Sequence, residues 1–104
     1  MARFQSNNAP LPANGTYESG TIYTGRSDYV VGSAYSDQGG TLYIEQSTDD
    51  ANWDISTSFA VIGGSGQGFS ETIYLPYARI RFVNGAAAQG SFRIYARLSS
   101  AGPR

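Results

Sequence analysis

The sequence contains no cysteine, no histidine and no lysine. Without cysteine the chain cannot form disulfides, thiolate zinc sites or a thiol nucleophile. Without histidine it lacks the commonest general base and transition-metal ligand. All seven cations are arginines, so lysine Schiff bases and the lysine of a phosphate-binding P-loop are also excluded. A serine or threonine nucleophile would have no ordinary activating base, and the sequence therefore predicts a protein that is not an enzyme and holds no cofactor.

Charge and long hydrophobic runs are scarce as well. Charged residues make up 14% of the chain and the net charge is −1, which does not favour nucleic-acid binding. No run approaches the roughly 20 apolar residues of a membrane span. The N-terminal sequence MARFQSNN has no apolar segment of the kind that directs secretion. We therefore expect neither a nucleic acid nor a membrane as partner, and no signal peptide.

Aromatic residues and glycine are abundant instead. The 104 residues are one domain's worth of chain, with 13% aromatic residues and 13 glycines, a composition typical of β-structure. The first fifteen residues are polar and contain Pro10, Pro12 and Gly15. They predict an extended N-terminal arm outside the core (residues 1–15), followed by a β-domain (residues 16–104).

Beyond the arm, apolar and polar residues alternate with period two, and turn residues interrupt the pattern every 8–12 positions. This pattern predicts an all-β fold, an antiparallel β-sandwich that is jelly-roll-like and has about eight strands. The expected strands are about Thr16–Glu18, Thr21–Thr24, Tyr29–Tyr35, Thr41–Ser47, Ile55–Ile62, Phe69–Leu75, Ala78–Val83 and Ser91–Leu98.

Two loops could be mistaken for ligand sites. Residues 63–68 (GGSGQG) lack the lysine and the following helix of a phosphate-binding loop, so we interpret them as a flexible tip. In the turn after the fourth expected strand, Asp49, Asp50, Asn52 and Asp54 lie close in sequence and could hold calcium. An Asx-rich structural turn is the favoured interpretation, because position 60, where an EF-type loop needs glutamate, is alanine. No metal site is predicted.

Four arginines alternate with apolar residues in the last two expected strands: Arg79, Arg81, Arg93 and Arg97. If residues 84–90 form a hairpin, all four lie on one outer surface. Such a surface could be solvated and paired with nearby acids such as Glu45 or Glu71. It could also dock an acidic partner or a second subunit, because arginine is enriched at protein interfaces.

The remaining candidates are an aromatic residue and a pair of carboxylates. Trp53 is expected to plug one end of the core, with an exposed sugar-stacking platform as the alternative. Eight tyrosines exceed what one small core needs, so some must be exposed, which favours association. Glu45 and Glu71 are the only mid-strand carboxylates, and nothing in the sequence pairs them as a glycosidase would require.

Two segments resemble a module of tailed-phage virion proteins. Residues 40–54, GTLYIEQSTDDANWD, are similar to a pattern "GTLYIEQS-D-x-NWD" of these proteins. Residues 76–93, PYARIRFVNGAAAQGSFR, are similar to the pattern "PY-RVR-x-x-NG-x-x-Q-x-x-FR" that often follows it. The two segments cover about a third of the chain. The resemblance implies a jelly-roll-like sandwich located in a phage virion.

The function expected on this basis is that of a virion structural protein, most specifically a capsid decoration (cement) protein on the outer head surface. Its partner would be the major capsid protein or another virion protein, and it would form a homo-oligomer, with a trimer favoured. The candidate partner-binding residues are Arg79, Arg81, Arg93, Arg97 and, in the arm, Phe4 and Leu11. The alternative is a carbohydrate- or receptor-binding module on the phage tail or head surface.

Overall fold

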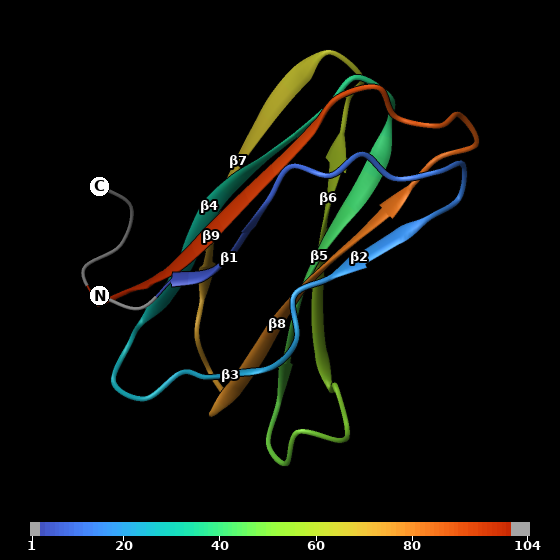
Figure 1. Cartoon of the computed structure of the whole chain (residues 1–104). Helices are drawn as coiled ribbons and strands as arrows, with labels where there is room; N and C mark the ends of the chain where they lie inside the picture. Colours follow the sequence, from blue (N-terminus) through green and yellow to red (C-terminus); the bar gives the residue numbers. More distant parts are fainter. Residues whose placement is uncertain (1–2, 101–104) are drawn as a thin grey trace.

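The chain folds into two antiparallel β-sheets that pack face to face (Figure 1). The computed structural model describes residues 3–100. Sheet A has the strand order β1-β9-β4-β7, and sheet B has the order β2-β8-β5-β6 with β3 also paired to β8. The strands are β1 (Arg3–Asn7), β2 (Thr16–Glu18), β3 (Ile22–Tyr23), β4 (Tyr29–Ser36), β5 (Gly40–Ser47), β6 (Ile55–Val61), β7 (Ser65–Thr72), β8 (Tyr77–Asn84) and β9 (Phe92–Ser99). The predicted all-β antiparallel sandwich is confirmed.

Most connections cross from one sheet to the other. Within residues 3–100, β5 and β6 are the consecutive strands that pair with each other in one sheet, while β2 and β3 lie one after the other along β8. This order is compatible with the jelly-roll-like arrangement expected from the sequence. Residues 3–100 contain no helix that could span a bilayer.

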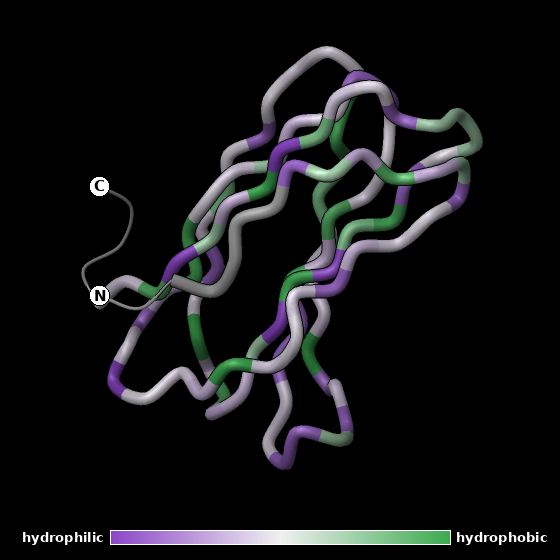
Figure 2. Tube along the Cα trace, in the orientation of Figure 1, coloured by the Kyte–Doolittle hydropathy of each residue, from purple (hydrophilic) through white to green (hydrophobic). Residues whose placement is uncertain are grey.

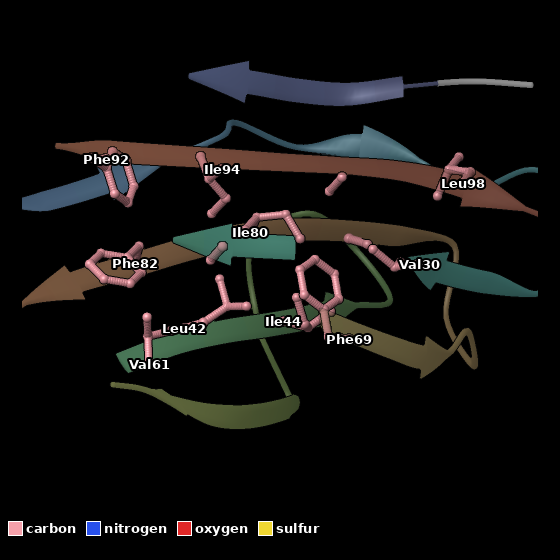
Figure 3. Close-up of a cluster of buried hydrophobic side chains, with 13 residues drawn as sticks. Val30, Leu42, Ile44, Val61, Phe69, Ile80, Phe82, Phe92, Ile94 and Leu98 are labelled. Atoms are coloured by element: carbon pink, nitrogen blue, oxygen red, sulfur yellow. The ribbon is translucent and has the colours of Figure 1, made fainter. Parts of the chain in front are cut away.

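The core lies between the sheets and is built from alternate residues of their strands (Figure 3). Hydrophobic and hydrophilic residues accordingly alternate along the trace in short stretches (Figure 2). Phe82 of sheet B packs against Phe92 of sheet A with ring centroids 5.0 Å apart, and Phe59 meets Phe69 at 6.0 Å. Each large side chain buried in this way stabilises the fold by about 1.5–3 kcal/mol. These contacts fix the two sheets against each other.

The structure corrects the interpretation of residues 1–15 as an arm outside the core, for the part from residue 3 onward; residues 1 and 2 lie outside the described residues. Strand β1 is hydrogen-bonded along β9, with Gln5 opposite Ala96 and Asn7 opposite Ile94. Leu11 packs against the core, and its backbone N–H donates to Oε1 of Gln89 at 2.8 Å. The polar sequence of β1 gave no sign of a strand. Its pairing with β9 is made by backbone groups, which do not depend on the type of side chain.

The glycine-rich segment is also more ordered than predicted. The turn is confined to residues 62–64, and β7 begins at Ser65, so that Gly66 and Gly68 lie within a strand paired to β4. The expected flexible tip is therefore wrong for residues 65–68. The strand prediction relied on alternating apolar and polar side chains, and glycine has no side chain that could show this alternation. Its backbone can nevertheless pair within a sheet.

The predicted hairpin between the last two strands is wrong, because β8 belongs to sheet B and β9 to sheet A. Buried polar side chains hold the connecting loop over the end of the sandwich. The amide of Asn84 donates to the carbonyls of Pro12 and Ala87, both at 2.9 Å, and the amide of Gln89 donates to Ser36 Oγ at 2.9 Å. The loop therefore carries the chain from one sheet to the other.

Candidate interaction surfaces

A buried carboxylate organises the outer face of sheet B. Glu45 points outward from β5, yet only 6% of its surface is exposed. Its Oε1 accepts a hydrogen bond from Arg79 Nε at 2.7 Å, and its Oε2 accepts one from Arg81 Nη2 at 3.1 Å. Ser56 Oγ on the neighbouring strand donates to Oε2 at 3.4 Å. One carboxylate therefore holds two guanidinium groups in place.

The pKa of Glu45 reflects this arrangement. Burial on its own would raise the pKa, but the hydrogen bonds from Arg81 and Arg79, together with the attraction of their charges, outweigh burial and leave the pKa below its ordinary value. Glu45 is thus held as a carboxylate and acts as a structural anchor for the two arginines. A raised pKa, as a catalytic acid requires, is not what this environment produces.

Each of the two arginines also lies over an aromatic ring. The guanidinium carbon of Arg79 is 4.1 Å from the centre of the Trp53 ring, and that of Arg81 is 4.3 Å from the centre of Tyr43. Both distances are within the range of cation–π attraction. We refer to Tyr43, Glu45, Trp53, Arg79 and Arg81 as the arginine–aromatic face.

The predicted role of Trp53 as a core plug is wrong. Its ring is half-buried on the outside of sheet B, where the guanidinium of Arg79 covers one side of the indole. That side is therefore not open for stacking on a sugar. On the same face of β8 as Arg79, Tyr77 forms an edge contact with Tyr23 at 5.8 Å, and 65% of the surface of Tyr23 is exposed.

The outer face of sheet A is built differently. Three strands present outward residues in rows: Ser70, Val31 and Arg97 form one row, and Gly68, Ser33 and Tyr95 form the next. The third row is Gly66, Tyr35 and Arg93, in which the Arg93 guanidinium lies 4.3 Å from the Tyr35 ring centre. A hollow of about 490 Å³ opens over the first two rows.

The four arginines predicted to share one surface therefore lie on opposite sides of the molecule. Arg79 and Arg81 belong to sheet B, and Arg93 and Arg97 to sheet A. The cause is the loop after β8, which crosses between the sheets where a hairpin was expected. The expected pairing with a nearby acid is confirmed for Arg79 and Arg81, whose partner is Glu45.

The two residues proposed in the arm have different surroundings. Leu11 is packed against the core and does not project from the domain. Phe4 lies within β1, and its side chain is outside what the structure describes. Their role in partner binding stays a prediction.

The two mid-strand carboxylates do not share a face. Glu45 lies on the outside of sheet B, whereas Glu71 is at an inward position of β7, where Thr57 Oγ1 donates to its Oε2 at 2.7 Å. Sheet B therefore separates them, and they do not flank a common cleft as a glycosidase pair would.

The Asx-rich turn is closed by its own hydrogen bonds. Asp49 accepts bonds from the backbone N–H groups of Asn52 and Ala51 at 2.8 and 3.0 Å, and from the Asn52 side chain at 2.7 Å. These bonds, that from the Asn52 backbone first, lower the pKa of Asp49 well below its ordinary value. Within residues 3–100, no group of three or more carboxylates is placed to hold a metal ion. The geometry is that of the structural turn.

Sequence reasoning missed the central role of Glu45 and the hollow on sheet A. Two features of the sequence could have indicated the role of Glu45. It lies in the middle of an expected strand, and Arg79 and Arg81 lie on one side of a later strand. The signal for the hollow was hidden, since Gly68, which lines it, was interpreted as part of a loop.

Comparison with known proteins places this fold in a family. Residues 2–99 match the family described as the uncharacterised protein YqxG N-terminal domain. The chain belongs to this family. It is also similar to the uncharacterized protein YqxG of Bacillus subtilis (strain 168), with 40% identity over 73 residues that make up 68% of this chain and 24% of the relative. This YqxG N-terminal domain thus spans about a quarter of the relative's length.

Solved structures with the same fold include the PBSX exported protein XepA. Its TM-score is 0.85 at 27% identity, over 98% of this chain and 37% of that protein. A protein from Bacillus endospore appendages, described as disulfide-linked pili, has a TM-score of 0.53 at 15% identity over 97% of this chain and 92% of its own. A CBM4 structure has a TM-score of 0.50, also at 15% identity, over 94% of this chain and 71% of its own. At this identity the last two show a shared fold alone.

Proposed function

We propose that this YqxG N-terminal domain is a structural module of a phage particle and docks onto another particle protein through the arginine–aromatic face. Two observations support an association with phage: the resemblance of residues 40–54 and 76–93 to tailed-phage virion proteins, and the similarity to XepA, a phage-derived protein. In its most specific form the proposal is a capsid decoration protein whose partner is the major capsid protein.

The observation that carries the proposal is the fixed geometry of the arginine–aromatic face. Tryptophan, tyrosine and arginine are the residues most enriched at the centres of protein interfaces. Here the salt bridges to Glu45 and the ring contacts already hold both arginines, so docking would immobilise few additional rotamers. The conformational cost of binding is correspondingly small.

The charge balance of this face also suits burial in an interface. The outward positions of β2, β3, β5, β6 and β8 contain two arginines and two glutamates, Arg79, Arg81, Glu18 and Glu45. Arg79 contacts both acids, Glu18 at 3.5 Å and Glu45 at 2.7 Å. A partner can therefore cover the face without burying an uncompensated charge. If the domain forms a trimer on the head, three such faces would bind together and gain affinity through avidity.

The experiment is to measure this chain on purified phage particles by mass spectrometry, relative to the major capsid protein. A copy number comparable to that of the capsid protein, retained on empty heads, supports decoration. A far smaller number contradicts decoration and favours the tail or vertex location of a receptor-binding module. Absence from particles contradicts the proposed function.

The role of the face is tested with Tyr23→Asp, at an exposed position beside it. We expect this variant to fold and to lose its place on the particle. Tyr95→Asp is the control, because Tyr95 is exposed on the opposite sheet. Equal loss of both variants from particles, or retention of both, contradicts docking through the arginine–aromatic face.

A further inference from the structure

Strand β6 is an open edge of sheet B. β5 pairs with one side of it, and no other strand within residues 3–100 pairs with its other side. The pairing with β5 is regular over all seven residues of the strand, Ile55–Val61. A strand that is paired on one side presents N–H and C=O groups without a strand partner on the other. An extended segment can add to such an edge by hydrogen bonding along its backbone.

The other edge strands have features that hinder such an addition. β2 and β3 are three and two residues long, and the register of β1 along β9 shifts between Arg3 and Gln5. On β7, Gln67 Nε2 donates to the backbone carbonyl of Gly68 at 2.7 Å, which engages part of that strand's backbone. Short strands, irregular pairing and charged side chains are common means by which proteins protect a sheet edge. β6 is long, regularly paired and uncharged, so it is the edge best suited to pairing.

The side chains of β6 indicate what kind of segment would fit beside it. Ser56, Ser58 and Ala60 are exposed on the outer face, and all three are small. On the inner face Phe59 is only half-buried, although its ring packs against Phe69 with centroids 6.0 Å apart. A neighbouring strand would cover the remaining apolar surface of Phe59. The segment that fits is therefore extended and uncharged, with small residues on its outer side.

A second copy of β6 has this composition. If two β6 strands lie antiparallel with Ser58 opposite Ser58, then Ser56 lies opposite Ala60, and Thr57 lies opposite Phe59. Residues that are directly opposite in an antiparallel pair lie on the same side of the sheet, so outer residues meet outer ones and inner residues meet inner ones. No like charges meet, because β6 contains no charged residue. A surface that matches itself in this way is what a two-fold symmetric dimer requires.

We infer that two copies of the domain form a dimer through β6, antiparallel and centred on Ser58, so that their B sheets join into one continuous sheet. In such a sheet the outer faces of both copies lie on the same side. The two arginine–aromatic faces would therefore point in one direction and engage a particle surface together, which raises the affinity through avidity. This consequence rests on the proposed function, whereas the pairing through β6 does not.

The first experiment measures the mass of the 104-residue chain by sedimentation equilibrium, in the absence of any phage protein, so its result does not depend on the proposed docking. We expect the mass of a dimer. Ser58→Arg should be a monomer, because two guanidinium-bearing side chains would start about 5 Å apart across the junction. Ser70→Arg should remain a dimer and is the matched control, since Ser70 is also an exposed serine on a long edge strand, β7. A wild-type monomer or trimer, equal masses for the two variants, or dissociation by Ser70→Arg alone would overturn the inference.

A pair of opposite charges tests the register of the two strands. Ser58→Arg and Ser58→Glu should each be monomeric alone, because like charges then face each other. An equimolar mixture of the two variants should form a one-to-one dimer, because the charges across the junction are then opposite. A mixture that stays monomeric contradicts the pairing centred on Ser58.

Hydrogen exchange of the wild-type chain gives a readout that does not depend on the folding of a variant. In the dimer, the amides on the open side of β6 donate to the second copy, and we expect them to exchange slowly. The amides on the open side of β7 are the control, and we expect them to exchange fast. Fast exchange of both sets, at a concentration at which the chain sediments as a dimer, would place the contact elsewhere and contradict the inference.

Discussion

Glu45 and Arg79 face each other directly across the β5–β8 pair, and Arg79 Nε donates to Glu45 Oε1 at 2.7 Å. The carboxylate is almost fully shielded from water, while the arginine extends further over the ring of Trp53. The same carboxylate binds Arg81, so that a single acid fixes the positions of both cations on this face. We therefore expect a change at any one of the three residues to affect stability as well as the proposed docking.

Acid is expected to weaken this contact. The pKa of Glu45 is lowered in the folded protein, so its stabilising contribution is complete above its ordinary value of 4.5 and is lost as the pH falls through the lower folded value. In Glu45→Gln the contribution is absent at every pH. We expect the difference in unfolding free energy between wild type and Glu45→Gln to shrink as the pH is lowered from about 5 toward 2. Urea unfolding followed by Trp53 fluorescence measures it, and a constant difference across this range would contradict the role of the carboxylate.

Charge reversal at Arg81 is expected to destabilise the domain. In Arg81→Glu a second carboxylate would face the shielded Glu45, and we expect a loss of about 2 kcal/mol, or roughly 10 °C in Tm. The control is Arg93→Glu, on an exposed position whose contacts are with Ser91 and Tyr35, where we expect a change within about 0.5 kcal/mol. Equal melting temperatures for the two variants would show that the Glu45 contacts contribute little. Reversals at Arg81 are consequently unsuitable as tests of docking alone.

Gly32 is expected to tolerate no side chain. It lies opposite Ala96 in the β4–β9 pair, and a Cβ on Gly32 would overlap the carbonyl oxygen of Tyr95. We expect Gly32→Ala to cost about 3 kcal/mol or more, because the obstacle is backbone and cannot rotate away. Gly66→Ala, in open space, should leave Tm almost unchanged. Thermal unfolding of the two variants is the measurement, and a stable Gly32→Ala would contradict the tight approach of β4 and β9.

The turn at Asp49 is expected to be independent of calcium. Replacing Asp49 by alanine removes the acceptor for the Ala51 and Asn52 amides, and we expect these two amides to exchange faster with solvent. Millimolar calcium should leave the wild-type Tm unchanged, since the carboxylate is already engaged by the turn. A calcium-dependent rise in Tm that disappears in Asp49→Asn would support a calcium site instead.

Removing β1 is expected to destabilise the domain. Deletion of residues 2–8 removes the backbone pairing with β9 and leaves β9 as an open edge, which promotes association between sheets. We expect a lower Tm and concentration-dependent elution in size-exclusion chromatography. An unchanged Tm would indicate that β1 behaves as the free arm that the sequence suggested.

The inward faces of the strands could be predicted from the sequence because they depend on the period-two pattern alone. Ile80 and Phe82 in β8, and Ile94 and Leu98 in β9, are buried as their alternation with arginines indicated. Glu71 also lies at an inward position, on β7, where it accepts a hydrogen bond from Thr57. The resemblance to phage proteins identified a phage-associated sandwich, while its decoration role stays a proposal.

What could not be predicted was the assignment of strands to sheets. Alternation reports which side of a strand is buried, and it is the same whether β8 and β9 pair with each other or lie in opposite layers. The crossing of the chain from β8 to the other sheet depends on single polar contacts, such as that of Gln89 with Ser36, which join residues 53 positions apart. The candidate site depended on this assignment, so four arginines expected on one surface became two pairs on opposite faces.

The pairing of β1 with β9 has a mechanical consequence. Arg3 lies opposite Arg97, so the first and last strands of the described fold enter and leave sheet A side by side at the same end. Because the two strands are antiparallel, tension applied between these neighbouring ends would load the β1–β9 hydrogen bonds one after another, starting at the Arg3–Arg97 pair. The domain would unzip at low force from its ends, whereas a push against its broad faces would be spread over every strand at once.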